Sequence, residues 1–166
     1  MNAEDLSSPT LYINRELSQL EFSRRVLAMA KDHQLPLLER VRYLSITSGI
    51  LDEFFEIRVA GLKQQAAYGA VQREADNLSA AEQLEKIAAS ARSLVSDLYD
   101  TMNHELIPAL GEEKIRLLRS NHWNEQQRDW LKRYFSREVA PIISPVGLDP
   151  AHPFPEPANK NLAFIV

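Results

Sequence analysis

The stretch from Ser79 to about Leu110 constrains the fold more than any other part of the sequence. Ser79 and Glu82 form the S-x-x-E pattern of a capping box, which satisfies free backbone N–H groups at the start of a helix. A helix this long and regular usually lies along another helix, so the stretch predicts a helical bundle. Ala88 and Ala91 would let the neighbouring helix approach closely. The apolar residues recur close to a heptad, at Leu84, Ala88, Ala91, Val95, Leu98 and Met102.

Two more helices are predicted before this stretch. Asn14 is a suitable N-cap for a helix that runs to about Asp32. Its apolar face is predicted at Phe22, Val26 and Met29, widened by Leu20 and Leu27. Pro36 suits the first turn of the next helix, which carries apolar residues as far as Leu62.

The helix that follows Pro36 contains one irregularity, Gly49. This glycine predicts either a helix break or a point of tight packing. Beyond it, one apolar row is predicted at Ile50, Phe54 and Ile57, and a second row at Leu51, Phe55, Val59 and Leu62.

The character of the sequence changes after Gly111. Residues 114–118 and 161–166 are predicted strands, and Asn124 with Gln127 caps a helix that ends before Pro141 and Pro145. The expected fold is therefore mainly α. We expect a flexible tail at 1–10, a helical domain with a long helical hairpin at 11–110, and the incomplete start of an α/β (α+β) domain at 111–166.

Composition and charge exclude several classes of function. The chain has no cysteine, which excludes disulfides, thiolate metal sites and cysteine nucleophiles. Its formal net charge of −4 argues against nucleic acid as a partner. The sequence contains no run of eighteen apolar residues, the length that a transmembrane helix needs. The acidic start lacks the pattern of an export signal, so a cytoplasmic location is expected.

An acidic cluster follows Gly49. Asp52 and Glu56 are four residues apart on a helix and could share a metal ion, but such sites need further ligands from other helices. A solvated or salt-bridged face, with Arg42 or Arg58 as partner, is the favoured interpretation. We therefore predict no metal ligand in this chain.

No catalytic residue is predicted in this chain either. None of the four histidines, His33, His104, His122 and His152, lies in a metal-spaced pair, and His152 is expected to have a loop or capping role. No glycine-rich phosphate-binding motif is present. A set of basic residues could attract a polyanion if its members converge: Arg24, Arg25, Arg40, Arg42, Arg58 and Lys63.

Three separated motifs carry a resemblance to a known family. They read LYINRELSQLEFSRRVL (11–27), PLLERVRYLSI (36–46) and LDEFFEIRVAGLKQQ (51–65). Together they resemble the N-terminal domain of class 1 polyphosphate kinases, and residues 122–166 resemble the start of that family's head domain. The resemblance covers nearly the whole chain after residue 10.

The resemblance implies an activity for a longer protein. Family members transfer the terminal phosphate of ATP reversibly to inorganic polyphosphate through a phosphohistidine, and they require Mg²⁺. They act as homo-oligomers in the cytoplasm or peripherally at a membrane. The N-terminal domain is helical and touches the nucleotide, and the head domain contributes to dimer contacts. The reactive histidine and magnesium ligands lie in later domains, so we expect the 166-residue chain alone to be inactive.

One departure from the family pattern matters for nucleotide binding, and smaller ones are Gln19 and Ser23. The family usually has an asparagine that contacts ATP directly before Leu-Asp-Glu-Phe, and this chain has Ser48, Gly49 and Ile50 there. Isoleucine has no amide with which to donate or accept a hydrogen bond. Either the nucleotide contact is made another way, or nucleotide binding is weakened. The alternative interpretation of the whole chain is a standalone, non-catalytic module that binds polyphosphate or a protein.

Overall fold

The computed structural model describes residues 8–69, 75–151, 153–156 and 161–165. The described residues fold mainly as helices, which confirms the predicted fold class. The chain divides into two compact units, Met1–Leu117 and Leu118–Val166, and each is described by itself below. The boundary expected near residue 110 on sequence grounds stays a prediction.

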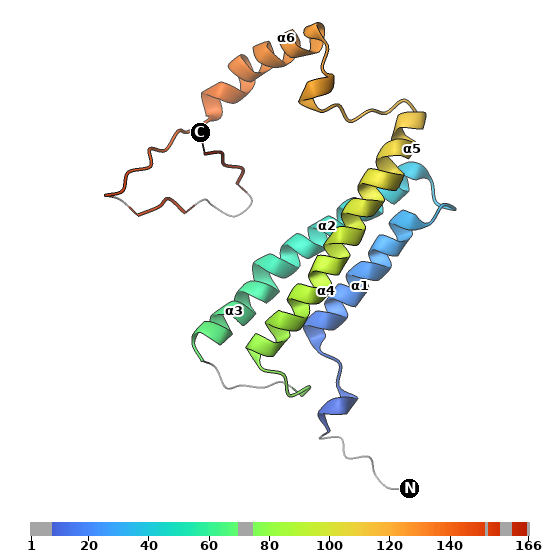
Figure 1. Ribbon diagram of the computed structural model, residues 1–166, viewed down its shortest axis with the longest axis vertical. Coiled ribbons are helices and arrows are strands. Elements are labelled where there is room, and N and C mark those ends of the chain that lie inside the picture. The colour runs from blue at the N-terminus through green and yellow to red at the C-terminus, as the bar shows by residue number, and fades with distance from the viewer. Residues whose placement is uncertain (1–7, 70–74, 152, 157–160, 166) are drawn as a thin grey trace. The chain divides into compact units, whose positions relative to one another are not determined.

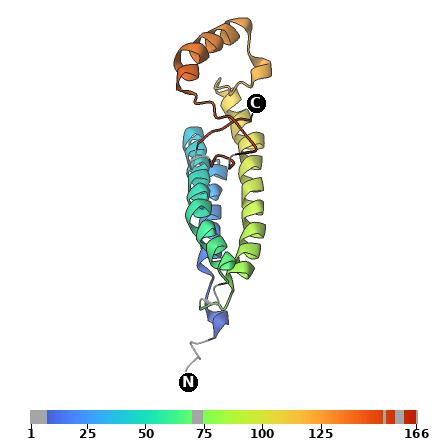
Figure 2. The same ribbon diagram turned by 90° about the vertical axis from the view of Figure 1, so that its left-hand side faces the viewer.

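The first unit is a bundle of three helical rods (Figures 1 and 2). The first rod is α1 (Arg15–Lys31). The second rod runs without interruption through α2 (Leu37–Glu53), the π-helical segment η2 (Phe54–Val59) and α3 (Ala60–Ala67). The third rod runs in the same way through α4 (Ala80–Asp100), the π-helical segment η3 (Thr101–Leu106) and α5 (Ile107–Glu112). A short 3₁₀ turn, Pro9–Leu11, precedes α1.

The helix starts predicted from capping residues are confirmed. The side chain of Asn14 accepts a hydrogen bond from the Leu17 N–H at 2.9 Å. Ser79 and Glu82 form the complete capping box at the start of α4, and their side chains satisfy each other's backbone N–H groups. These caps depend on residues close in sequence, so they form wherever the helix forms.

The buried face of the third rod lies beside the predicted one. Ile87 and Leu94 are almost fully buried, whereas Ala88 is exposed and Leu84 and Val95 are half-buried. Polar residues obscure this stripe in the sequence, because Gln83 and Thr101 are also buried. The buried residues of this rod are Ala80, Gln83, Ile87, Ala91, Leu94, Leu98, Thr101, Leu106 and Leu110.

The apolar face predicted for α1 is also only partly correct. Leu20 and Leu27 are buried, but Phe22 and Met29 are exposed. The small residues Ser23 and Ala30 complete the buried stripe. Small side chains let the rods approach closely, and a search for large apolar residues overlooks them.

Gly49 is neither a helix break nor a point of tight packing. It is exposed in the middle of α2, and a Cβ atom placed on it would meet no other atom within 4 Å. The irregularity of the second rod lies further on, in η2. There the buried residues Phe54 and Val59 are five positions apart, and the Ala60 N–H bonds to the Phe55 carbonyl, five residues back.

The third rod contains the same kind of irregularity, in η3. Thr101 and Leu106 are consecutive buried residues five positions apart, and the Ile107 N–H bonds to the Met102 carbonyl. Buried residues elsewhere on the two rods follow each other at three or four positions, as a regular α-helix requires. Each π-helical segment therefore absorbs one extra residue and keeps the later apolar residues on the buried face.

Polar contacts tie the rods together at both ends. At one end, the Asn14 amide donates to Asp76 at 2.7 Å and to Gln83 at 3.0 Å. At the other end, the buried Arg40 donates to the Ala30 carbonyl at 2.8 Å and to Glu105 at 3.1 Å. Both clusters join segments more than sixty positions apart in the sequence. Lys31 also pairs with Asp97, which links α1 to α4.

The second unit contains α6 (Glu125–Tyr134), and the predicted capping box of Asn124 and Gln127 starts this helix. A π-helical segment (Phe135–Val139) and a 3₁₀ turn (Ala140–Ile142) follow α6, and a second 3₁₀ turn (Ser120–His122) precedes it. Helical structure therefore ends at the prolines, as predicted.

Neither predicted strand is present among the described residues. At 114–118, the start of the segment belongs to the end of α5, because Lys114 takes a positive φ of 64° and the Ile115 N–H bonds to the Leu110 carbonyl at 2.8 Å. At 161–165, no other described segment pairs with the chain. A strand needs such a partner for its backbone hydrogen bonds.

We predict that one residue can be removed from η3 without damage to the core. Deleting the exposed Asn103 shortens the step from Thr101 to Leu106 to four positions, so the rod can continue as a regular α-helix. The free energy of unfolding, measured with urea and circular dichroism, should change by about 1 kcal/mol or less.

The control is the deletion of Ser93, an exposed residue of α4. This deletion rotates the following part of the rod by about 100° and moves Leu94 and Leu98 away from the core. It should cost more than about 3 kcal/mol. Equal losses for the two deletions would contradict the role assigned to η3.

Candidate functional site

The predicted nucleotide-contacting residues lie together on α2, one turn before η2. Ser48 and Gly49 are exposed and Ile50 is half-buried. The space around Gly49 is open. This part of α2 therefore offers an accessible surface with an aliphatic side chain at its edge. This surface can contact a ligand through its shape and through apolar contact, and the Ser48 hydroxyl can add a hydrogen bond.

The acidic cluster beyond Ile50 is solvated. Asp52 and Glu53 are exposed, and Glu56 is half-buried and has a partner. The expected pairing of these carboxylates with Arg42 is not found, because Arg42 lies 3.7 Å from Glu39. Within the described ranges, no group of three or more His, Asp or Glu side chains could hold a metal ion. No Mg²⁺ ligand is therefore assigned to these residues.

Two of the histidines have clear neighbours. His33 Nδ1 lies 3.3 Å from the guanidinium of Arg40, and His104 lies 3.7 Å from Asp100 on the same helical rod. His122 ends the 3₁₀ turn that precedes α6. His152 lies outside the described residues, and its predicted loop or capping role stays a prediction.

The basic residues of the first unit do not act as one group. Arg40 is buried in the contact with Glu105, and Arg24 is bound to Glu21 and to Ser90. Arg25 lies over the ring of Phe22 at 5.7 Å. Arg58 and Lys63 remain exposed, with no ion pair to another described residue.

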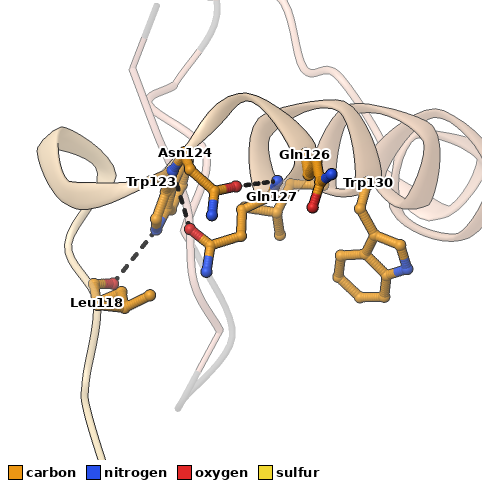
Figure 3. Close-up of a pocket in the computed structure, with 7 residues that line it drawn as sticks. Leu118, Trp123, Asn124, Gln126, Gln127 and Trp130 are labelled. Atoms are coloured by element: carbon orange, nitrogen blue, oxygen red, sulfur yellow. Dashed lines mark hydrogen bonds between the residues drawn. The ribbon is translucent and has the colours of Figure 1, made fainter.

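The second unit contains a pocket of about 440 Å³ that the sequence did not indicate (Figure 3). Trp123 donates from its indole N–H to the Leu118 carbonyl at 3.4 Å, and the side-chain amides of Asn124 and Gln127 are engaged in the capping box. The pocket is mainly apolar, and it presents no titratable side chain with which to perform acid–base chemistry. Its lining residues are Leu118, Trp123, Asn124, Gln126, Gln127, Trp130 and Leu131.

Trp130 belongs to an exposed aromatic face of α6. Its ring stacks on Tyr134 with 5.2 Å between centroids, and more than half of the side chain is exposed. Tryptophans such as Trp123 and Trp130 are predicted from the sequence to anchor a core or an interface. Within the described part of this unit, neither is buried.

Family models match both units, in order along the chain. Residues 12–118 match the polyphosphate kinase N-terminal domain. Residues 126–166 match the polyphosphate kinase middle domain. The fold and the two matches place the chain among proteins that combine a helical N-terminal domain with a middle domain. The chain belongs to the polyphosphate kinase family.

Similar full-length relatives carry the family name. The polyphosphate kinase of Pseudomonas syringae pv. tomato is 48% identical over 99% of this chain and 22% of its own length. That of Neisseria meningitidis serogroup B is 47% identical over 92% of this chain and 22% of its own length. The chain thus spans less than a quarter of the curated relatives that it matches.

A solved structure shares the fold. The crystal structure of polyphosphate kinase from Porphyromonas gingivalis superimposes with a TM-score of 0.64 and 29% sequence identity. The superposition covers 78% of this chain and 18% of that protein.

We predict that Gly49→Ala stabilises the first unit. Alanine favours the interior of a helix over glycine, and its Cβ would enter open space, so the free energy of unfolding should rise by about 0.5–1 kcal/mol. Gly69→Ala is the matched control, because Gly69 has a φ of +65° and alanine should destabilise the protein there. A loss of stability at Gly49 in thermal and urea unfolding would mean that another group packs against this surface.

Proposed function

We propose that the protein that contains this chain is a polyphosphate kinase, which transfers the terminal phosphate of ATP to inorganic polyphosphate. The reaction is reversible and passes through a phosphohistidine. As the bond from the terminal phosphorus to ADP breaks, a bond to the histidine nitrogen forms, and the phosphoryl group then moves to the terminal oxygen of polyphosphate. The observation that carries this proposal is the match of two consecutive polyphosphate kinase domains across nearly the whole chain.

In this proposal the first unit forms a wall of the nucleotide site. The nucleotide-facing residues are Ser48, Gly49 and Ile50, and the support for them is their accessibility on one part of α2. This part of the protein also contributes to the interface of a homo-oligomer. The enzyme acts in the cytoplasm, either free or peripherally at a membrane. None of the described helices is long and apolar enough to cross a bilayer.

The chemical groups of the reaction belong, in this proposal, to the remainder of the protein. The Mg²⁺ ligands and the reactive histidine are located there. The support for this division is that the chain covers only 22% of the length of the relative from Pseudomonas syringae pv. tomato. The 166-residue chain by itself is therefore inactive.

A second candidate function is a non-catalytic module that binds polyphosphate or a protein. Two observations favour it: Ile50 lacks the amide expected for a nucleotide contact, and Arg58 and Lys63 are exposed cations. Such a module would bind polyphosphate without a nucleotide, and salt would weaken the binding strongly.

The first test compares the full-length protein with the 166-residue chain. The full-length protein should form polyphosphate from ATP in the presence of Mg²⁺ and release ADP, and the shorter chain should form none. Product length on gels and ADP release are the measurements. Salt-sensitive binding of polyphosphate without turnover by the full-length protein would instead support the binding module.

A second test concerns Ile50. Replacing it with asparagine supplies a hydrogen-bonding amide at an accessible position, and one such bond contributes about 0.5–1.5 kcal/mol. In the full-length enzyme, Ile50→Asn should lower the KM for ATP by about two- to tenfold and leave the KM for polyphosphate unchanged. Ile50→Leu is the control for size. An unchanged KM for ATP in the asparagine variant would place the nucleotide away from this part of α2.

A further inference from the structure

Arg58 is an exposed cation on the second rod. It lies in η2 between the exposed Ile57 and the buried Val59. In a regular α-helix, the position four residues after the buried Phe54 would continue the buried stripe, and that position is Arg58. The extra residue absorbed by η2 brings Val59 into the core instead and leaves Arg58 in solvent.

The same extra residue sets the direction of Arg58 relative to Ile50. Ile50 and Arg58 are eight positions apart in the sequence. Because η2 accommodates one extra residue, this distance corresponds to seven positions of a regular α-helix. Seven positions are about two turns, so both residues lie on one face within about 20°, separated by about 10 Å along the axis. The spacing resembles that between the base and the terminal phosphates of an extended nucleoside triphosphate.

Other cations of the first unit lack this combination. Lys63 is exposed, but by the same count it points about 120° away from Ile50. Arg42 is paired with Glu39. Within the described ranges, Arg58 has no ion pair with Asp52 or Glu53. A free guanidinium group presents several N–H donors in a planar arrangement that matches a phosphate group.

We propose that Arg58 contacts the phosphate groups of a nucleotide whose base lies against Ile50. This inference rests on the proposed function and adds a phosphate-binding residue to its nucleotide-side wall. Ile50 offers the base an apolar surface, and Arg58 offers the phosphates a positive charge two turns further along. The π-helical segment η2 makes the pair possible by turning Arg58 away from the core.

The test measures binding of Mg-ATP and of adenosine to the full-length protein by calorimetry. Arg58→Ala should weaken ATP binding by about tenfold and leave adenosine binding within twofold. Arg58→Lys should restore part of the ATP affinity, because it restores the charge without the planar donors. Lys63→Ala removes an equal charge from a side of the rod that does not face the proposed nucleotide, so it should change the affinity for neither ATP nor adenosine. Unchanged melting temperatures verify that the variants fold.

The outcomes separate the inference from the function on which it rests. If the unaltered protein binds neither ATP nor adenosine, the proposed function fails. If it binds both and Arg58→Ala changes neither affinity, the function stands and the role of Arg58 is overturned. Equal weakening by Arg58→Ala and Lys63→Ala would indicate general attraction of charge and would also overturn it.

Discussion

Two helical rods must keep one mainly apolar stripe against their neighbours over about six and eight turns, although one step in each stripe spans five residues. These steps, from Phe54 to Val59 and from Thr101 to Leu106, do not fit the period of an α-helix. A π-helical segment in each rod resolves the mismatch. Without it, either the later leucines would leave the core or Arg58 and Glu105 would enter it. The packing of the later part of each rod and the contact between Arg40 and Glu105 depend on these two adjustments.

The centre and the ends of the bundle are held together differently. In the centre, the buried hydroxyls of Ser23, Thr47 and Thr101 bond to carbonyls four residues back in their own helices, so they link no two rods. The buried contact between rods is apolar there and fixes no axial position by itself. The Asn14 and Arg40 clusters, together with the hydrogen bonds from Arg24 to Ser90, fix the axial positions of the rods, because hydrogen bonds between particular atoms tolerate little sliding.

Local chemistry was predictable from the sequence, and long-range geometry was less so. The helix starts at Asn14, Ser79 and Asn124 follow from side chains that bond to nearby backbone groups. A fixed helical period misplaced Ile57 and Phe55 on buried rows, because it ignored the five-residue step. The family resemblance indicated residues 48–50 as a nucleotide contact, and that role stays a prediction. The pocket beside Trp123 was missed, since it depends on how an extended segment returns to a helix.

The end of α5 has a practical consequence for work on this chain. Residues 112–122 are all exposed, and Lys114 holds a left-handed backbone conformation at the helix end. Three basic side chains, Lys114, Arg116 and Arg119, fall within this exposed stretch, and each is a cleavage point for trypsin. The rods, in contrast, protect their backbones with helical hydrogen bonds. Brief digestion is thus a direct way to obtain the three-rod bundle as a separate fragment.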